Sequence, residues 1–332
     1  GRQLSVLSKC DPRVWASVIS LVLGIGILAG KILAYLLTGS AAILSDALEG
    51  LTNVVAAAFS LTAIVFARQP PDADHPYGHG KAEHVSAVFE GGLIAMAAIG
   101  VGVYAGAELW RGSDVAALNF GIALTVITGL ANAALGLYLL RVGRKFRSVA
   151  LVADGEHMLA DFKTTLGVLV GLGLVWLTGW QVLDAITAIL VAAHLLWIGV
   201  GLIRDGLGAL LDREDPALMA SVVEAFPKVR RAGQLRLHAL RAIRSGDRVH
   251  LDAHLVVPEF WSVEQAHQHN KELERLLLDA CAFEGDLAVH ADPCERKFCR
   301  ECDLPDCELR QEEFADLQEL TLPNARRLRT ES

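Results

Sequence analysis

Charged side chains are scarce in this sequence. Only 20% of its 332 residues are Asp, Glu, Lys or Arg, whereas 53% are hydrophobic and the mean hydropathy is +0.39. So apolar a composition excludes an ordinary soluble protein of this length and indicates membrane spans. The net charge of −8 gives no support for nucleic-acid binding.

Other absences narrow the function further. The sequence has no His-Glu-x-x-His motif and no nucleophile with an evident partnered base, which disfavours a membrane metalloenzyme. No cleavable signal peptide is evident, because the first residues are not apolar. Cysteine is rare until the end of the chain, where four of the six cysteines cluster. Such clustering on a cytosolic tail favours metal or redox chemistry over a disulfide framework.

Six stretches are long and apolar enough to span a bilayer, which takes about 20 residues. Lys and Arg gather before the first stretch, in the second and fourth connections, and after the sixth. The positive-inside rule therefore places both termini in the cytoplasm. The expected spans are residues 14–37, 41–67, 83–110, 117–141, 149–178 and 182–208.

The last third of the chain is charged and polar. Asp215 followed by Pro216 is typical of a helix start, and segments of alternating polarity flank Ser245-Gly246-Asp247, which indicates a hairpin. The order helix-strand-strand-helix-strand predicts a small α+β domain with helices on one face of its sheet. The expected elements are a helix over 216–226, strands over 235–243 and 248–257, a helix over 263–282 and a strand over 286–290.

Two polar stripes interrupt the apolar stretches with one shared spacing, i, i+3, i+7, which places each stripe on one helix face. A charge near the bilayer centre costs about 2.5–3.5 kcal/mol, so the stripes indicate an ion site between two helices. Polar contacts between helices, or a proton path without metal, are the alternatives. The stripes are Asp46, Glu49 and Asn53 in the second stretch and Asp154, His157 and Asp161 in the fifth.

Four of these six residues offer the ligands of a tetrahedral divalent ion such as Zn²⁺. The other two lie one turn earlier and either support the ligands or line the approach. The expected ligands are Glu49, Asn53, His157 and Asp161, with Asp46 and Asp154 behind them.

Three further clusters carry possible metal ligands. A loop with one Asp and two His either holds a second ion or forms a packed turn. Five residues of the soluble domain either build a metal site or are unrelated surface groups. Four thiols within 14 residues either bind Zn²⁺ or a softer ion, or form disulfides or a disordered tail. The clusters are Asp72, His75 and His79; His238, His254, His267, His290 and Asp292; and Cys294, Cys299, Cys302 and Cys307.

At these residues the sequence resembles the cation diffusion facilitator family of zinc and divalent-cation efflux proteins, and most of all its bacterial iron/zinc efflux branch. The likeness runs from about residue 14 to 294. Its marks are Thr38-Gly39-Ser40, Ser45-Asp46-x-x-Glu49-x-x-x-Asn53, His75-Pro-Tyr-Gly-His79-Gly-Lys81-x-Glu83, Ala153-Asp154-x-x-His157-x-x-x-Asp161, Leu211-Asp212-Arg213 and His290-x-Asp292-Pro293.

The resemblance implies a homodimer in the lipid bilayer of a bacterial inner membrane, with transport, loop and cytoplasmic metal sites formed by the residues named above. It also implies a cytoplasmic domain similar to copper metallochaperones, regulatory Zn²⁺ bound there, and a salt bridge between Lys81 and Asp212 at the membrane face of the dimer. The resulting parts are an N-terminal segment, a six-helix transmembrane domain, a metal-binding dimerisation domain and a Cys-rich charged tail, over residues 1–13, 14–208, 209–293 and 294–332.

The transport site departs from the family pattern, since most members have Asp or His-Asp where this chain has Glu49 and Asn53. Asn cannot ionise, so the site carries a charge of about −2 rather than −3. We therefore expect looser binding and altered selectivity among Zn²⁺, Cd²⁺, Fe²⁺, Co²⁺ and Mn²⁺. The predicted mechanism is proton-coupled antiport by alternating access; a metal-gated channel or a membrane metal sensor is the alternative.

Overall fold

The structure, a computed structural model, describes two compact units, Gly1–Leu211 and Asp212–Ser332. It describes residues 11–38, 41–111, 119–180, 182–246 and 248–327, and only the backbone of 34–35, 37–38, 41–49, 108–111, 119–125, 168, 172, 175–176 and 184. The fold class predicted from the sequence, a helical transmembrane domain followed by a small α+β domain, is confirmed.

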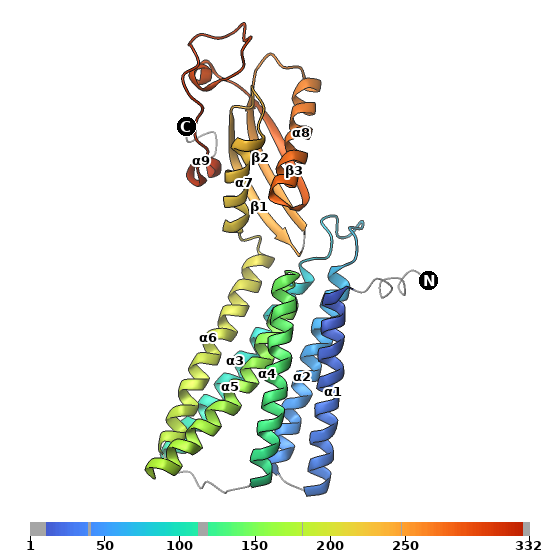
Figure 1. Cartoon of the computed structure of the whole chain (residues 1–332), viewed down its shortest axis with the longest axis vertical. Helices are drawn as coiled ribbons and strands as arrows, with labels where there is room; N and C mark the ends of the chain where they lie inside the picture. The colour runs from blue at the N-terminus through green and yellow to red at the C-terminus, as the bar shows by residue number, and fades with distance from the viewer. Residues whose placement is uncertain (1–10, 39–40, 112–118, 181, 247, 328–332) are drawn as a thin grey trace, which may run out of the picture. The chain divides into compact units, whose positions relative to one another are not determined.

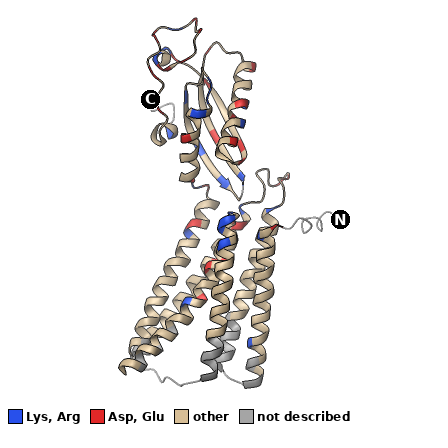
Figure 2. Cartoon of the chain, in the orientation of Figure 1, with Lys and Arg blue, Asp and Glu red and all other residues tan. Residues whose placement is uncertain are grey.

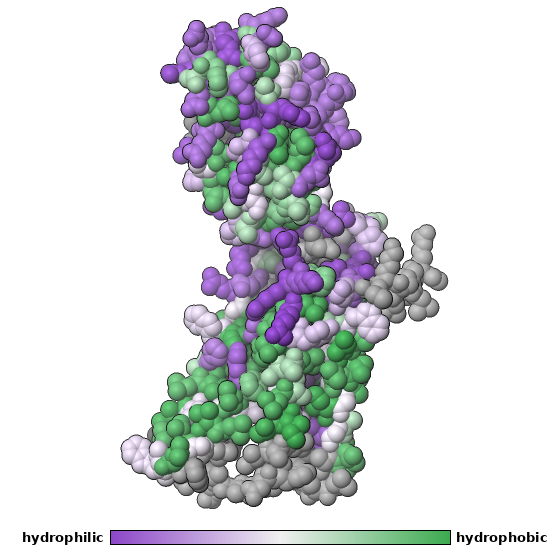
Figure 3. Space-filling model, in the orientation of Figure 1, coloured by the Kyte–Doolittle hydropathy of each residue, from purple (hydrophilic) through white to green (hydrophobic). Residues whose placement is uncertain are grey.

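The first unit is a bundle of six long helices that run side by side (Figure 1). Its surface is largely apolar (Figure 3), and charged residues are sparse along the helices compared with the second unit (Figure 2). The helices are α1 (Pro12–Thr38), α2 (Ala41–Ala67), α3 (Ala82–Arg111), α4 (Asn119–Lys145), α5 (Val149–Thr178) and α6 (Val182–Leu210).

Five of these helices, all except α5, contain a described stretch that is long and apolar enough to cross a membrane. The N-terminal half of α5 carries the polar stripe and Lys163, and several side chains further along lie outside the described residues. The helix itself spans 30 residues, which is more than a bilayer crossing requires.

Glycines let the helices of the bundle approach closely. The many Gly and Ala residues in the apolar stretches are typical of such packing between membrane helices. A Cβ added to Gly91 of α3 would lie 2.8 Å from the carbonyl oxygen of Gly199 on α6. A Cβ added to Gly136 of α4 would lie 2.9 Å from the carbonyl oxygen of Gly155 on α5. These two contacts fix the spacing of the pairs α3–α6 and α4–α5.

The second unit follows the predicted order. Asp215 caps its first helix by accepting hydrogen bonds from the backbone of Ala217 and Leu218. Strand β1 pairs antiparallel with β2, and β2 pairs parallel with β3, which is longer than predicted. The elements are α7 (Pro216–Val229), β1 (Arg236–Ser245), β2 (Arg248–Val257), α8 (Val263–Cys281) and β3 (Glu284–Pro293), followed by a 3₁₀ helix η2 (Arg296–Glu301) and α9 (Leu322–Arg326).

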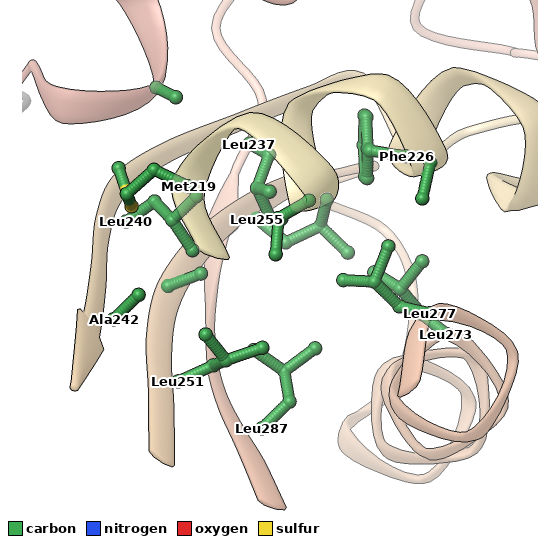
Figure 4. Close-up of a cluster of buried hydrophobic side chains, with 14 of the residues drawn as sticks. Met219, Phe226, Leu237, Leu240, Ala242, Leu251, Leu255, Leu273, Leu277 and Leu287 are labelled. Atoms are coloured by element: carbon green, nitrogen blue, oxygen red, sulfur yellow. The ribbon is translucent and has the colours of Figure 1, made fainter. Parts of the chain in front are cut away.

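The two faces of the sheet differ because successive side chains of a strand point to opposite sides. Leu251, Leu255 and Leu287 face α7 and α8 and build the buried core (Figure 4). His254 and Val256 alternate with these leucines and point to the other side, which we call the outer face. The tail packs on part of this outer face through Phe298, which shares a buried cluster with Val256.

Replacement of Gly91 by Ala tests the close approach of α3 and α6. The new methyl would also lie 2.9 Å from the Leu202 Cβ, and such overpacking costs about 1–3 kcal/mol. We expect the variant to melt several degrees lower than wild type in detergent. Gly92→Ala is the matched control, because its added Cβ meets nothing within 4 Å. Equal melting temperatures for the two variants would contradict the packing argument.

Candidate metal sites

Three of the predicted transport ligands meet inside the first unit. Asn53 of α2 donates from Nδ2 to Asp161 Oδ2 of α5 at 2.5 Å, and its Oδ1 lies 3.0 Å from His157 Nε2. Asn53 and His157 are buried, with exposed fractions of 8% and 4%. The i, i+4 spacing of His157 and Asp161 places both side chains over one face of α5, as the sequence predicts.

Two more helices contribute groups that the spacing argument misses. Glu90 of α3 is fully buried, and one of its oxygens lies 3.7 Å from His157 Nδ1. Asn132 of α4 is 3.4 Å from Asp161 Oδ2. Glu90 stands alone in an apolar stretch, and that isolation is the sequence signal that could have identified it. A buried Lys31 on α1 has the same kind of signal.

Asp154 is also completely buried, but its partner is a residue of α1. Its Oδ2 accepts a hydrogen bond of 2.9 Å from the Ser20 hydroxyl. This contact is consistent with the predicted supporting place one turn before His157. The side chains of Asp46 and Glu49 lie outside the described residues, so their parts in the site stay predictions.

Several atoms of this polar cluster have no hydrogen-bond partner among the described residues. They are the two carboxylate oxygens of Glu90, Oδ1 of Asp154 and Nδ1 of His157. The negative charges of Asp154 and Asp161 also act on Glu90. Buried carboxylates that repel one another and lack partners are costly unless a cation or protons neutralise them.

The loop between α2 and α3 brings Asp72, His75 and His79 together. His75 Nδ1 lies 3.2 Å from Asp72 Oδ1 and His79 Nε2 lies 3.4 Å from Asp72 Oδ2. One ligand atom from each lies within 4.8 Å of the others, a separation that a metal ion can bridge. The backbone N–H of His75 lowers the pKa of Asp72, which keeps that carboxylate ionised.

The outer face of the sheet carries a row of three histidines. His238 of β1 is in register with His254 of β2, which is in register with His290 of β3. Asp292 Oδ2 lies 3.1 Å from both His238 Nε2 and His254 Nδ1, and its Oδ1 lies 3.6 Å from His290 Nε2. The sheet register thus brings together four of the five residues predicted for the cytoplasmic site, and their metal binding stays a prediction.

His267 does not belong to this row within one chain. It is exposed on α8, and α8 covers the opposite face of the sheet through Leu273 and Leu277. Its predicted place in the cytoplasmic site stays a prediction.

Burial lowers the pKa of His238 below its ordinary value, although the Asp292 carboxylate acts in the opposite direction. A neutral imidazole at cellular pH is the form that binds metal.

Three further features stay predictions. Lys81 lies in the first unit and Asp212 in the second, so their salt bridge stays a prediction. The four tail cysteines are free thiols, two of them buried, but they are not among the described groups whose ligand atoms gather within 4.8 Å. The four-part division of the chain also stays a prediction, although the two compact units meet at residues 211 and 212.

These features define a class of protein. A bundle of apolar helices encloses carboxylate, amide and imidazole groups that contact one another. A small α+β unit follows in the chain and has its own cluster of histidines. Intramembrane ionisable groups of this kind mark ion pathways. The chain is thus an integral membrane protein built to handle metal cations.

Comparison with known proteins gives the family. A family model for the cation efflux transmembrane domain matches residues 17–211, and one for the cytoplasmic domain of cation efflux proteins matches residues 211–294. The chain belongs to the cation efflux family, whose members are transporters and not enzymes. This finding confirms the resemblance stated from the sequence motifs.

Individual relatives are similar in sequence to most of this chain. An uncharacterized transporter of Synechocystis sp. (sll1263) is 32% identical over 280 residues, which cover 84% of this chain and 90% of the relative. The cation-efflux pump FieF of Serratia proteamaculans is 30% identical over 80% of this chain and 87% of its own length. The cation-efflux pump FieF of Klebsiella pneumoniae is 29% identical over 84% of this chain and 92% of its own length.

Asp292→Asn tests the outer-face cluster. The loss of the one carboxylate that contacts all three histidines should lower the affinity of the cluster for Zn²⁺ by at least about tenfold. Asp286→Asn is the matched control, because Asp286 lies on the same strand and face but pairs with His250 at 2.8 Å. The measurement is the number of ions bound per purified full-length chain at a buffered Zn²⁺ concentration. Equal binding by both variants would refute the assignment.

Proposed function

We propose that this transporter exports Zn²⁺ from the cytoplasm in exchange for protons, with Glu49, Asn53, His157 and Asp161 as its transport ligands. The observation that carries the proposal is the buried contact of Asn53 with both His157 and Asp161. His157 Nε2, Asn53 Oδ1 and Asp161 Oδ2 already converge. A divalent ion that enters there replaces hydrogen bonds by ligand bonds from the same atoms.

Proton coupling follows from the chemistry of these ligands. Imidazole titrates near the pH of cells and must be neutral to bind a metal, so metal and proton compete for His157. Glu90, 3.7 Å from the other ring nitrogen, can accept its N–H once the ring turns slightly, and a carboxylate in that position orients a metal-binding histidine. Protonation from the outer side then lowers the affinity and releases the ion.

The ligand chemistry also bears on which metal is carried. Imidazole favours Zn²⁺, whereas carboxylate and amide oxygens also suit Mn²⁺ or Fe²⁺. Asn132 adds one more neutral oxygen or N–H near Asp161 without adding charge. We therefore place Zn²⁺ first and keep Cd²⁺, Fe²⁺, Co²⁺ and Mn²⁺ as candidate cargo.

The proposal includes an orientation and an assembly. Both termini lie in the cytoplasm of a bacterial cell, the bundle crosses the inner membrane, and two copies form a homodimer through their cytoplasmic domains. The matched cytoplasmic domain model and the bacterial relatives support this arrangement. Metal bound at the outer-face cluster then regulates the dimer, while the loop cluster Asp72, His75 and His79 binds a further ion.

The decisive experiment measures metal uptake into proteoliposomes under an imposed pH gradient. Asp161→Asn keeps the size of the side chain but removes its charge, and we expect it to reduce gradient-driven Zn²⁺ flux by at least about tenfold. The matched control is Glu156→Gln on the same helix, because Glu156 faces Arg144 and Lys163 at 3.9 and 4.0 Å instead of the cluster.

Each outcome of this experiment is informative. Flux that follows the gradient and disappears only in Asp161→Asn supports an antiporter with the proposed site. Flux of equal size with and without the gradient identifies a channel. Zn²⁺ binding without any flux identifies a metal sensor. Repeating the measurement with Cd²⁺, Fe²⁺, Co²⁺ and Mn²⁺ ranks the cargo.

Glu90→Gln tests the role proposed for the carboxylate behind His157. The amide keeps the shape of the side chain but offers no negative charge, so we expect Zn²⁺ transport to slow by about 10–100-fold. Transport rate and melting temperature are measured together. A normal rate in a normally folded variant would show that Glu90 is a bystander.

A further inference from the structure

The chain continues beyond the part that the family models match. The match to the cytoplasmic domain ends at residue 294, and Cys294 is the first of four cysteines that lie within 14 residues. The first part of this tail, up to Leu304, packs on the outer face of the sheet. Phe298 and Cys302 form a buried cluster with Leu235, which directly precedes β1, and with Val256 of β2. Cys294 and Leu304 pack against this cluster.

The sulfur atoms sit in positions that suit thiolates. The backbone N–H of Gln311 donates to Cys299 Sγ at 3.5 Å. Backbone N–H groups of Glu259 and Leu304 likewise hydrogen-bond to Cys294 and Cys302. Three of the four sulfurs therefore accept an N–H bond. A thiol that merely fills an apolar core needs no such donor, whereas a thiolate ligand is stabilised by it.

The thiols also lie near enough to influence one another. Negative charge on Cys302 or Cys307 acts on Cys294, and negative charge on Cys307 acts on Cys302. Without a cation, several thiolates in this place would repel one another in a partly desolvated setting.

Arginines surround the tail and supply positive charge. Arg310 donates to the carbonyl oxygens of Cys299, Cys302 and Leu304 at 3.3, 3.0 and 2.6 Å, so it wraps the segment that carries the cysteines. Two arginines of the domain pair with acidic residues of the tail. They are Arg230, which contacts Asp303 at 2.9 Å, and Arg236, which contacts Glu301 at 2.6 and 2.7 Å.

We propose that Cys294, Cys299, Cys302 and Cys307 bind one soft divalent cation, with Zn²⁺ as the probe ion, in a closed tetrathiolate site. Each thiol gives its proton to water as its sulfur bonds to the metal, so four protons leave per ion bound. The net charge of the site becomes −2, which the positive charge of Arg310 offsets in part. The sulfurs are less tightly gathered than the two His-Asp clusters, so binding closes the tail locally.

The proposed metal site in the tail also stabilises the first strand of the sheet. Arg236, which the tail holds through Glu301 and through the Phe298 ring at 4.2 Å, lies two residues before His238. A metal bound by the four cysteines thus braces the strand that carries the first histidine of the outer-face row. This inference does not depend on the proposed proton coupling or on the transported ion.

Cobalt substitution of the reduced full-length protein in detergent tests the proposal. Co²⁺ bound by thiolates absorbs through sulfur-to-metal charge transfer, whereas Co²⁺ bound by His and Asp alone does not. We expect this absorption in wild type and in Cys281→Ser, whose thiol instead lies 3.5 Å from the Ser221 carbonyl oxygen. The absorption should fall severalfold in Cys302→Ser. Its absence in wild type, or its persistence unchanged in Cys302→Ser, would overturn the proposal.

A second measurement avoids the folding of variants. Wild-type protein is alkylated at its thiols with and without Zn²⁺, and each cysteine is followed by mass spectrometry. We expect Zn²⁺ to slow the modification of Cys294, Cys299, Cys302 and Cys307 together, by about tenfold or more, while the rate at Cys281 stays the same. Unchanged rates at the four tail cysteines, or disulfides that persist under reducing conditions, would refute the site.

Discussion

The cost of charge inside an apolar helix bundle is the constraint on which the membrane unit depends. A buried carboxylate is tolerated only where a partner or a cation compensates for lost water. Asp154 has the Ser20 hydroxyl, Asp161 has Asn53 and Asn132, and Glu90 faces His157. Helices α1 to α5 must therefore converge at one level, and the glycine contacts of Gly91 and Gly136 allow the close packing that this requires.

A different constraint organises the second unit, namely the strict alternation of side chains along a strand. It sends Leu251 and Leu255 into the helix-covered core and His254 to the outer face. Because β3 is parallel to β2, the register places His290 next to His254. Asp292 follows two residues later on β3 and therefore lies on the same face of the sheet. A shift of the register by one residue would exchange the His-Asp cluster with the core, so burial of the leucines and assembly of the cluster depend on the same pairing.

The sequence predicts those parts whose signal is a spacing. The stripe of His157 and Asp161, the six long helices and the order of elements in the second unit were all predictable because a helix or strand repeats its faces at a fixed period. Glu90 and Asn132 were not, since single residues on α3 and α4 meet the site only through tertiary packing. His267 is a case that one chain does not decide: it is exposed on α8, which covers the face of the sheet opposite the row, so its place in the cytoplasmic site stays a prediction. The 3₁₀ helix after Glu295 also has no periodic signal in a tail rich in charge.

Besides the loop cluster of Asp72, His75 and His79, three sets of possible ligands with different chemistry occupy three parts of one chain. The bundle offers oxygen and imidazole groups, the outer face offers imidazole with one carboxylate, and the tail offers sulfur alone. A transport site has to release its ion in every cycle, so it needs ligands that a proton can displace near neutral pH, and imidazole fulfils this condition. Four thiolates bind Zn²⁺ too tightly for such release and suit an ion that stays. If both proposals hold, the softness of the ligands separates the transported ion from the ion that stays in the tail.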